Sequence, residues 1–174
     1  MRNVNLILGG ARSGKSTFAL AEASRFEGRK AFIATAEAKD KEMKTRILNH
    51  KKERGPDWTT FEEPILISQV LTSVVQKWNI VIIDCLTLWI SNILHARLDI
   101  YDAVDVLARA VSQESPARLY IVSNEVGLGI VPDSELSRVY RDALGYANRR
   151  IAEAAQNVYF MVAGIPLQIK GASK

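Results

Sequence analysis

Short apolar runs alternate along this chain with longer segments in which apolar residues recur every three or four positions. The first pattern is typical of strands that are buried on both faces, and the second is typical of helices that bury one face. Ile80–Asp84 is the clearest apolar run, and Ser134–Ala154 carries the longest helical stripe. Strands are predicted at Val4–Leu8, Ala31–Thr35, Trp58–Phe61, Ile80–Asp84, Leu119–Ser123 and Val158–Val162. Helices are predicted at Lys15–Phe26, Asp40–Arg54, Ile65–Lys77, Leu86–Arg97, Asp102–Gln113 and Ser134–Ala154.

The alternation of strands and helices predicts the fold class. Strands that are separated by helices pair in parallel, and the helices then cover both faces of the sheet. No repeat, linker or low-complexity tract interrupts the pattern, so residues 1–174 are expected to form a single domain. Ligands of such folds bind beyond the carboxyl ends of the strands. The residues that follow the strands are therefore the first candidates for a binding site: Gly9, Thr35, Asp84, and Asn124 with Glu125.

A phosphate-binding motif follows the first predicted strand. The segment Gly9, Gly10, Ala11, Arg12, Ser13, Gly14, Lys15, Ser16 matches G-x-x-x-x-G-K-[ST] between a strand and a helix. Gly9 and Gly14 permit backbone angles that side chains disfavour, so the N–H groups of the loop can surround phosphate oxygens. Lys15 is expected to contact the β- and γ-phosphates of a nucleoside triphosphate, and Ser16 is expected to hold Mg²⁺. The motif favours a P-loop (RecA-like) three-layer α/β/α fold with a mainly parallel sheet.

Acidic residues follow two further predicted strands. Asp84 is predicted to hold Mg²⁺ together with Ser16, because an acid at the tip of a neighbouring strand does so in P-loop proteins; the alternative is a helix N-cap. Thr87 is expected to be structural. Glu125 is a candidate second carboxylate in the segment Asn124–Pro132, for which the alternative is a structural turn. Because that segment is so apolar, it is expected either to pack inside or to meet an apolar ligand.

The predicted charged helix carries one of the two histidines of the chain. Arg46, His50 and Arg54 are spaced four residues apart, which places them on nearly one face of a helix. Cationic neighbours keep an imidazole neutral and nucleophilic near pH 7, and they also attract phosphate. His50 is therefore a candidate covalent nucleophile toward phosphorus; the alternative is a solvated basic helix with an incidental histidine. His95 is expected to be a packed or surface residue.

Composition narrows the classes of function. The chain has 23 basic and 19 acidic side chains, a net charge of +4, which fits an anionic substrate but lacks the clustered basic stripe of nucleic-acid-binding proteins. Cys85 is the single cysteine, which excludes an internal disulfide and a cysteine-based zinc site. No apolar run approaches the roughly 18 residues of a membrane helix, and no signal peptide precedes the motif. A cytoplasmic location is therefore expected.

Further segments with distinctive residues are spread along nearly the whole chain. Beside the phosphate loop they are Ile33–Ala36, Glu42–Met43, Arg46–Ile47, His50–Lys51, Trp58 with Glu62, Asp84–Thr87, Asn124–Pro132, Arg141–Asp142, Gly145, Asn148, and Ala163–Pro166 with Lys170. Together they resemble the bifunctional adenosylcobinamide kinase/adenosylcobinamide-phosphate guanylyltransferase family of cobalamin biosynthesis. The phosphate loop is shared with many proteins, whereas the other segments are far more specific. Two positions depart from the family pattern, Arg149 for glutamine and Asn49 for a second histidine found in some members, and neither bears on the expected chemistry.

The resemblance implies two reactions. First, ATP or GTP phosphorylates the aminopropanol hydroxyl of adenosylcobinamide. Second, GTP gives its GMP to His50 with release of pyrophosphate, and the phosphorylated corrinoid then accepts the GMP to yield adenosylcobinamide-GDP. The resemblance also implies homotrimers, for which the predicted helices Leu86–Arg97 and Asp102–Gln113 are candidate contact surfaces. The residues implied to bind the guanine nucleotide are Lys51, Lys52, Glu53, Arg54 and Glu62.

Two alternatives to this interpretation stay open at the level of the sequence. A P-loop kinase of another small molecule would need Lys15 and Asp84 but would leave His50 without a role. An oligomeric RecA-like ATPase acting on nucleic acid would need a basic stripe or an aromatic-studded loop, and neither is evident at a net charge of +4.

Overall fold

The structure, a computed structural model, describes residues 3–38 and 40–171; at Arg46, Asn49, His50 and Glu53 it describes the backbone but not the side chains. The strands are β1 (Asn3–Gly9), β2 (Lys30–Ala34), β3 (Trp58–Glu62), β4 (Ile80–Asp84), β5 (Arg118–Val122), β6 (Asn157–Val162) and β7 (Ile165–Lys170). The helices are α1 (Lys15–Ser24), α2 (Lys41–Arg54), α3 (Ile67–Val74), α4 (Leu86–His95), α5 (Ile100–Ser112) and α6 (Glu135–Ala154).

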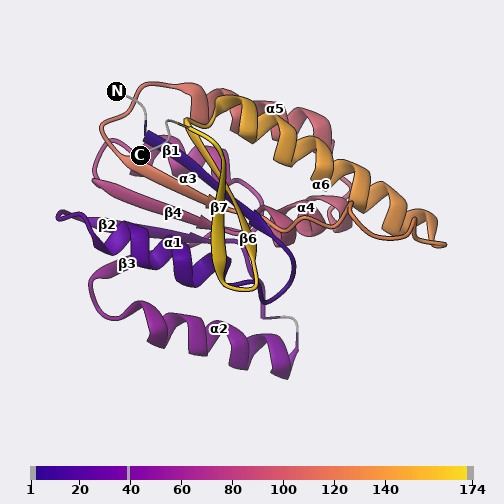
Figure 1. Cartoon of the computed structure of the whole chain (residues 1–174), viewed down its shortest axis with the longest axis horizontal. Helices are drawn as coiled ribbons and strands as arrows, with labels where there is room; N and C mark the ends of the chain where they lie inside the picture. Colours follow the sequence, from indigo (N-terminus) through magenta and orange to yellow (C-terminus); the bar gives the residue numbers. More distant parts are fainter. Residues whose placement is uncertain (1–2, 39, 172–174) are drawn as a thin grey trace.

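The strands form one mainly parallel sheet in the order β3-β2-β4-β5-β1-β6-β7 (Figure 1). All neighbours pair in parallel except β6 and β7, which pair antiparallel. The carboxyl ends of β1 to β6 therefore meet at one edge of the sheet, which is where a parallel sheet binds ligands. This arrangement confirms the predicted α/β class.

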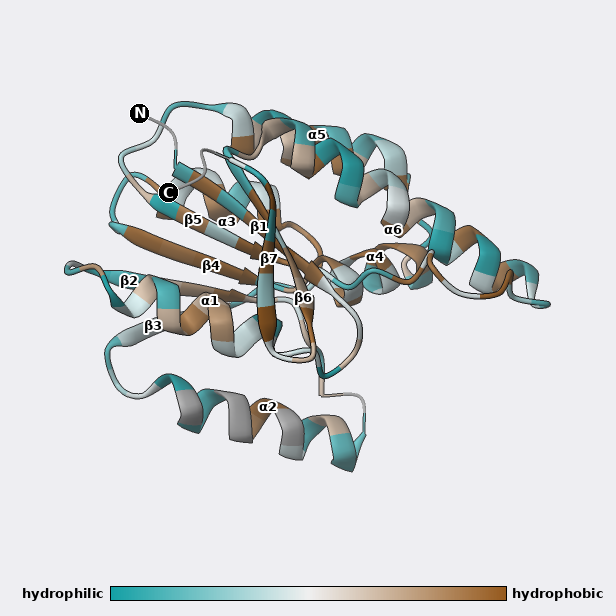
Figure 2. Cartoon of the chain, viewed as in Figure 1, coloured by the Kyte–Doolittle hydropathy of each residue, from teal (hydrophilic) through white to brown (hydrophobic). Residues whose placement is uncertain are grey.

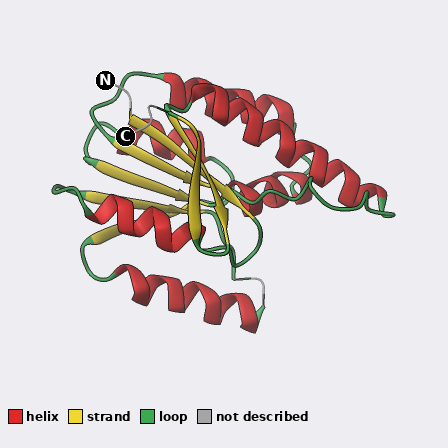
Figure 3. Ribbon diagram, in the orientation of Figure 1, coloured by secondary structure: helices red, strands yellow, loops and turns green. Residues whose placement is uncertain are grey.

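Helices cover both faces of the sheet, as Figure 3 shows by element type. On one face, side chains of α1 such as Ala19 pack on Ile7, Ile82 and Tyr120. The residues next to these in each strand point their side chains to the opposite face of the sheet, because side chains alternate along a strand. These pack against α3, α4, α5 and α6 in the larger apolar cluster, which contains Leu6, Val81, Ile83, Ile121, Leu71, Trp89, Leu107 and Leu144 among others. The expected three-layer α/β/α architecture is therefore confirmed, and the apolar strands lie at its centre (Figure 2).

Several predicted helix boundaries shift by a few residues because the capping side chains lie outside the helix. Asp40 accepts a hydrogen bond from the backbone N–H of Met43, so α2 begins at Lys41. In the same way, the side chain of Asp99 accepts a hydrogen bond from the backbone N–H of Asp102. Helix α5 therefore begins at Ile100, before the predicted start at Asp102. A residue that caps a helix has extended backbone angles although its side chain belongs to the first turn.

The C-terminal strand β7 is absent from the sequence-based prediction, which ended with Val158–Val162. Its six residues are all exposed, so the strand has no buried face that would produce an alternating pattern. Pro166 lies within it, and proline is tolerated in a sheet only at an edge or a bulge. Both features follow from the place of β7 at the edge of the sheet, and both remove the signals from which a strand is predicted.

Candidate functional site

The phosphate loop joins β1 to α1 at the carboxyl edge of the sheet. Gly9 has φ of 149°, and a Cβ atom built there would lie 2.7 Å from the carbonyl oxygen of Met161. Gly14, the residue before α1, has φ of 90°. The expectation that both glycines adopt backbone angles unfavourable to other residues is therefore confirmed. Arg12 also has a left-handed backbone, with φ of 56°, at the exposed turn of the loop.

The loop is braced from within and from the C-terminal hairpin. The ammonium of Lys15, which is buried, donates to the carbonyl of Gly10. The backbone N–H of Gly164, in the turn between β6 and β7, donates to the carbonyl of Ser13 at 3.2 Å. The hairpin that the sequence did not reveal therefore supports the loop directly. Ser16 lies in the first turn of α1. The contacts predicted between the loop residues, Ala11 and Arg12 among them, and phosphate stay predictions, as does the contact of Ser16 with Mg²⁺.

Three strand ends line up in one register row. Asp84 of β4 pairs with Ala34 of β2, which in turn pairs with Glu62 of β3. Neighbouring strands lie about 4.8 Å apart, so the backbones at Asp84 and Glu62 are about 10 Å from each other. On the other side, β5 separates β4 from β1. Asp84 is thus one strand removed from the phosphate loop and not on the neighbouring strand, and its predicted role as a metal ligand stays a prediction.

Threonines join the strand ends to one another. The hydroxyl of Thr35 donates to the carbonyl of Cys85 at 2.7 Å and accepts from its N–H at 2.8 Å. Thr87 accepts a hydrogen bond from the backbone N–H of Asn124, in line with its expected structural role. Thr35 is completely buried, so its hydroxyl joins the ends of β2 and β4 below the surface. The predicted contact between Thr35 and a nucleotide stays a prediction.

The thiol beside Asp84 is unsuited to act as a nucleophile. Burial, with a smaller effect from the negative charge of Asp84, raises the pKa of Cys85 to about 11. At neutral pH the group is therefore a thiol, and only the thiolate is strongly nucleophilic.

Helix α2 is attached to the sheet through its last turn. The ammonium of Lys51 forms an ion pair and a hydrogen bond with the carboxylate of Glu62. The guanidinium of Arg54 lies 3.8 Å from the centre of the Phe32 ring. Burial lowers the pKa of Arg54, and the negative charges of Asp84 and Glu62 oppose this shift. The structure thus brings three of the residues implied to bind guanine nucleotide to one place.

The other residues of α2 that were predicted to act at the site are Lys52, His50 and Glu53. Lys52 is exposed. His50 and Glu53 lie in α2, but their side chains are outside the described part of the structure. His50 immediately precedes Lys51, so its backbone lies one residue from the ion pair with Glu62.

The segment after β5 begins against the phosphate loop. The backbone N–H of Glu125 donates to the carbonyl of Gly9 at 3.1 Å, and its carboxylate accepts from the N–H of Gly127. Farther along, Leu128 is 80% exposed and Ile130 is 97% exposed. Figure 2 shows apolar colour in the outer part of this arm, before its hydrophilic tip joins α6. Of the two expectations for this apolar segment, packing inside is therefore wrong for the isolated chain.

The second histidine is a surface residue. His95 is exposed in the last turn of α4, and its Nδ1–H donates to the carbonyl of Ser91 at 2.7 Å. That local bond satisfies one ring nitrogen within the helix. Nothing in this arrangement connects His95 to the carboxyl edge of the sheet.

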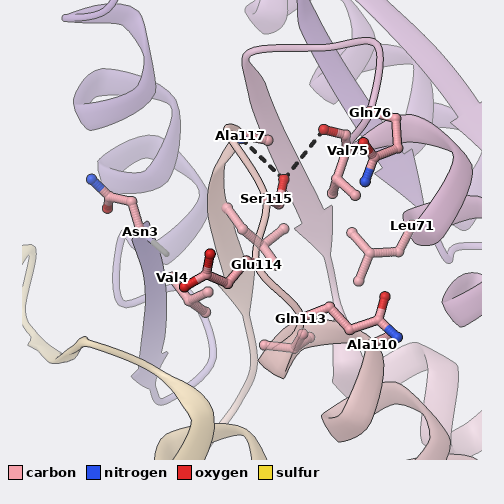
Figure 4. Close-up of a pocket in the computed structure, with 12 residues that line it drawn as sticks. Asn3, Val4, Leu71, Val75, Gln76, Ala110, Gln113, Glu114, Ser115 and Ala117 are labelled. Atoms are coloured by element: carbon pink, nitrogen blue, oxygen red, sulfur yellow. Dashed lines mark hydrogen bonds between the residues drawn. The ribbon is translucent and has the colours of Figure 1, made fainter. Parts of the chain in front are cut away.

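A small pocket lies at the opposite end of the sheet, where β1 and β5 begin (Figure 4). Its lining includes Asn3, Leu71 and Ser115, and the hydroxyl of Ser115 donates to the carbonyl of Val75. The cavity measures about 20 Å³, which is room for a water molecule but not for a nucleotide. The candidate site is therefore the carboxyl edge, with the phosphate loop, Asp84 and the end of α2.

Comparisons with known proteins identify the family of the chain. Residues 5–169 match the family described as cobinamide kinase / cobinamide phosphate guanyltransferase, CobU. The chain belongs to this family. A relative from Pseudomonas aeruginosa, named bifunctional adenosylcobalamin biosynthesis protein CobP, is 43% identical over 171 residues, which cover 96% of this chain and 97% of the relative. The CobU protein of Salmonella typhimurium, with the same description, is 35% identical and is covered over 98% of its length.

Family membership and fold together imply the use of nucleotides. A solved ATPase from the type III secretion system of pathogenic bacteria superposes with a TM-score of 0.56 at 13% identity, covering 92% of this chain and 51% of that chain. At this identity the likeness concerns the RecA-like P-loop fold alone. None of the helices in the described ranges has the length and apolar character that a membrane crossing needs.

Proposed function

We propose that this protein catalyses both reactions of its family. In the first, the terminal phosphate of ATP or GTP passes to the aminopropanol hydroxyl of adenosylcobinamide. In the second, a ring nitrogen of His50 forms a bond to the α-phosphorus of GTP as pyrophosphate leaves. An oxygen of the corrinoid phosphate then bonds to that phosphorus, the bond to His50 breaks, and adenosylcobinamide-GDP is released.

The observation that supports this proposal most directly is the attachment of α2 to the catalytic edge. Lys51 is paired with Glu62, which lies in the same register row as Asp84. The helix that carries His50 is thereby held at the edge where the phosphate loop ends. A kinase of another small molecule would have no use for a histidine-bearing helix at this position, because phosphoryl transfer needs no covalent intermediate on the protein.

The chain also offers suitable groups for a magnesium ion. The hydroxyl of Ser16 and the carboxylate of Asp84 are hard oxygen donors, and Asp84 is half-buried at the edge of the sheet. The part of the chain that the structure describes contains no cluster of three or more acidic, histidine or cysteine side chains. That fits Mg²⁺, which takes one or two protein carboxylates and completes its shell with water and phosphate. Bound there, it would neutralise phosphate charge, a task that Lys15 shares.

A labelling experiment tests the second reaction. Incubation with GTP labelled at the α-phosphate is expected to leave acid-labile label on the protein, and mass spectrometry should place one GMP on the peptide that contains His50. GTP labelled at the γ-phosphate is the matched control and should leave no label, because pyrophosphate departs. A protein that phosphorylates a corrinoid but never retains the α-label would be a kinase alone.

We also propose a homotrimer. Helices α4 and α5 bury most of their apolar side chains in the core, Trp89 and Leu107 among them, which leaves them poorly suited as contact surfaces. The arm at Leu128 and Ile130 and the outer strand at Ile165 and Leu167 are exposed instead, and exposed apolar patches mark interaction sites. Light scattering is expected to give three times the 19.3 kDa mass of the chain. A single-chain mass at micromolar concentration would contradict the assignment.

A further inference from the structure

The chain continues in an extended conformation beyond the end of β5. The backbone N–H of Ser123 donates to the carbonyl of Ile7 at 3.0 Å, and that of Glu125 donates to the carbonyl of Gly9 at 3.1 Å. Alternate residues therefore remain bonded to β1, which is the pattern of a parallel strand pair. Asn124 is the residue between them, and it lies beside Gly9, the first residue of the phosphate loop.

The backbone of Asn124 is held by side chains from two helices. Its N–H donates to the hydroxyl of Thr87 in α4 at 2.8 Å, and its carbonyl accepts from the Nδ2 of Asn148 in α6 at 2.9 Å. Asn148 is buried, with 6% of its surface exposed. In the described ranges, the hydrogen bonds of Asn124 all run through its backbone, and its own carboxamide contributes none of them. The residue is thus fixed in place by its main chain.

The alternation of side chains places this carboxamide on the face of the sheet that α1 covers. Val122 belongs to the apolar cluster that packs on α1, whereas Ile121 belongs to the cluster on the opposite face. Because the extended backbone continues past β5, the side chain of Asn124 points to the same face as that of Val122. On β4, Ile82 is also in the cluster against α1, so Asp84 shares this face as well.

Asn124 lies between the phosphate loop and Asp84. Strand β5 is the neighbour of both β1 and β4, and Val122 pairs with Asp84 on one side and with Ile7 on the other. Asn124 is therefore about 6.6 Å beyond the row of Asp84 along the strand. A magnesium ion held as proposed above, by Ser16 and Asp84, would bring the terminal phosphate of a bound nucleotide over the end of β5, where this carboxamide lies.

We infer that Asn124 is a catalytic residue of the kinase reaction, whose carboxamide N–H donates a hydrogen bond to the phosphoryl group during its transfer. The inference rests on the proposed function, because it requires the chain to phosphorylate adenosylcobinamide. The bond between the terminal phosphorus and its bridging oxygen breaks, a bond to the hydroxyl oxygen forms, and the hydroxyl proton is released to water. Asn124 exchanges no proton; it stabilises the charge on the equatorial oxygens as they separate from the nucleotide.

Initial rates of corrinoid phosphorylation by the full-length protein, measured over a range of ATP concentrations, test this role. Asn124→Ala removes the donor, and we expect kcat to fall about a hundredfold, which is the order of loss when one such donor is removed. The ATP concentration for half-maximal rate should change by less than about threefold, because the bond is strongest in the transition state. Asn124→Leu restores the volume without the donor and should be equally slow.

Gln76→Ala is the matched control. It removes another carboxamide, at an exposed position that lines the small pocket at the opposite end of the sheet, and it should leave kcat as in the wild type. Thermal unfolding separates a catalytic role from a structural one. Because the carboxamide of Asn124 makes no hydrogen bond within the described structure, both of its variants should unfold within about 2 °C of the wild type.

Guanylylation of His50 with α-labelled GTP provides a second readout on the same variants. Attack there is at the α-phosphorus, so the rate constant should fall by less than about tenfold. A wild-type kcat for phosphorylation in Asn124→Ala, its recovery in Asn124→Leu, or an equal loss of both reactions would overturn the inference. Absence of corrinoid phosphorylation by the wild-type protein would instead refute the proposed function, so the two failures are distinguishable.

Discussion

Replacing His50 with alanine is expected to abolish the transfer of GMP while leaving kinase activity in place. The covalent step belongs to the second reaction alone, and removal of a covalent nucleophile lowers a rate by about a thousandfold or more. The kinase reaction depends on the phosphate loop, which lies on β1, whereas α2 is attached at β3 on the other side of β2, β4 and β5. Both activities are measured on the same preparation, with adenosylcobinamide and its phosphate as the acceptors.

His95→Ala is the matched control for this prediction. It removes the other histidine of the chain, whose Nδ1–H is bonded within its own helix, and it should leave both activities as in the wild type. Retention of GMP transfer in His50→Ala would refute the assignment of the nucleophile. Loss of transfer in folded His95→Ala would show that the wrong histidine had been chosen.

The carboxyl edge could be located from sequence because its residues directly follow apolar runs. The strand before Gly9 and the strand before Asp84 are buried on both faces, so their ends are marked by the first polar or glycine residue. The motif then specified the conformation of the loop, because Gly9 and Gly14 both have a positive φ, and a Cβ atom at Gly9 would also lie too close to the carbonyl oxygen of Met161. Local pattern and local chemistry agree at these positions, which is the condition under which sequence determines structure most clearly.

The contacts that hold α2 could not be predicted in the same way. Arg54 reads in the sequence as one more charge on a basic helix, and the resemblance assigned it to the nucleotide. Its partner Phe32 reads as an ordinary core residue of β2, and nothing in the spacing of the two indicates a stack. Strand order was equally inaccessible: that β5 lies between Asp84 and the phosphate loop depends on how non-local strands pair, for which a single sequence carries no periodic signal.

Strand order also bears on whether one nucleotide site serves both reactions. Asp84 lies on β4, which is two strands from β1 and two strands from β3. At about 4.8 Å between strands, the phosphate loop and the Glu62 end of α2 are each about 10 Å from Asp84, and about 19 Å from each other across the sheet. A triphosphate that extended from the loop along this edge toward β3 would meet Asp84 before it reached the end of α2. This arrangement favours a single elongated site with Asp84 near its middle.

Lys15→Ala is accordingly expected to impair both reactions, by about a hundredfold or more, because a cation aimed at phosphate oxygens stabilises the charge that develops during transfer. Rates of corrinoid phosphorylation and of His50 guanylylation are measured at saturating and at low nucleotide. Since Lys15 is buried and bonded to Gly10, Lys15→Met serves as a second variant that retains the aliphatic stem, and thermal unfolding checks both. A selective loss of kinase activity with normal guanylylation would mean that GTP for the second reaction binds outside the phosphate loop. The chain would then possess two nucleotide sites, with β2, β4 and β5 between them.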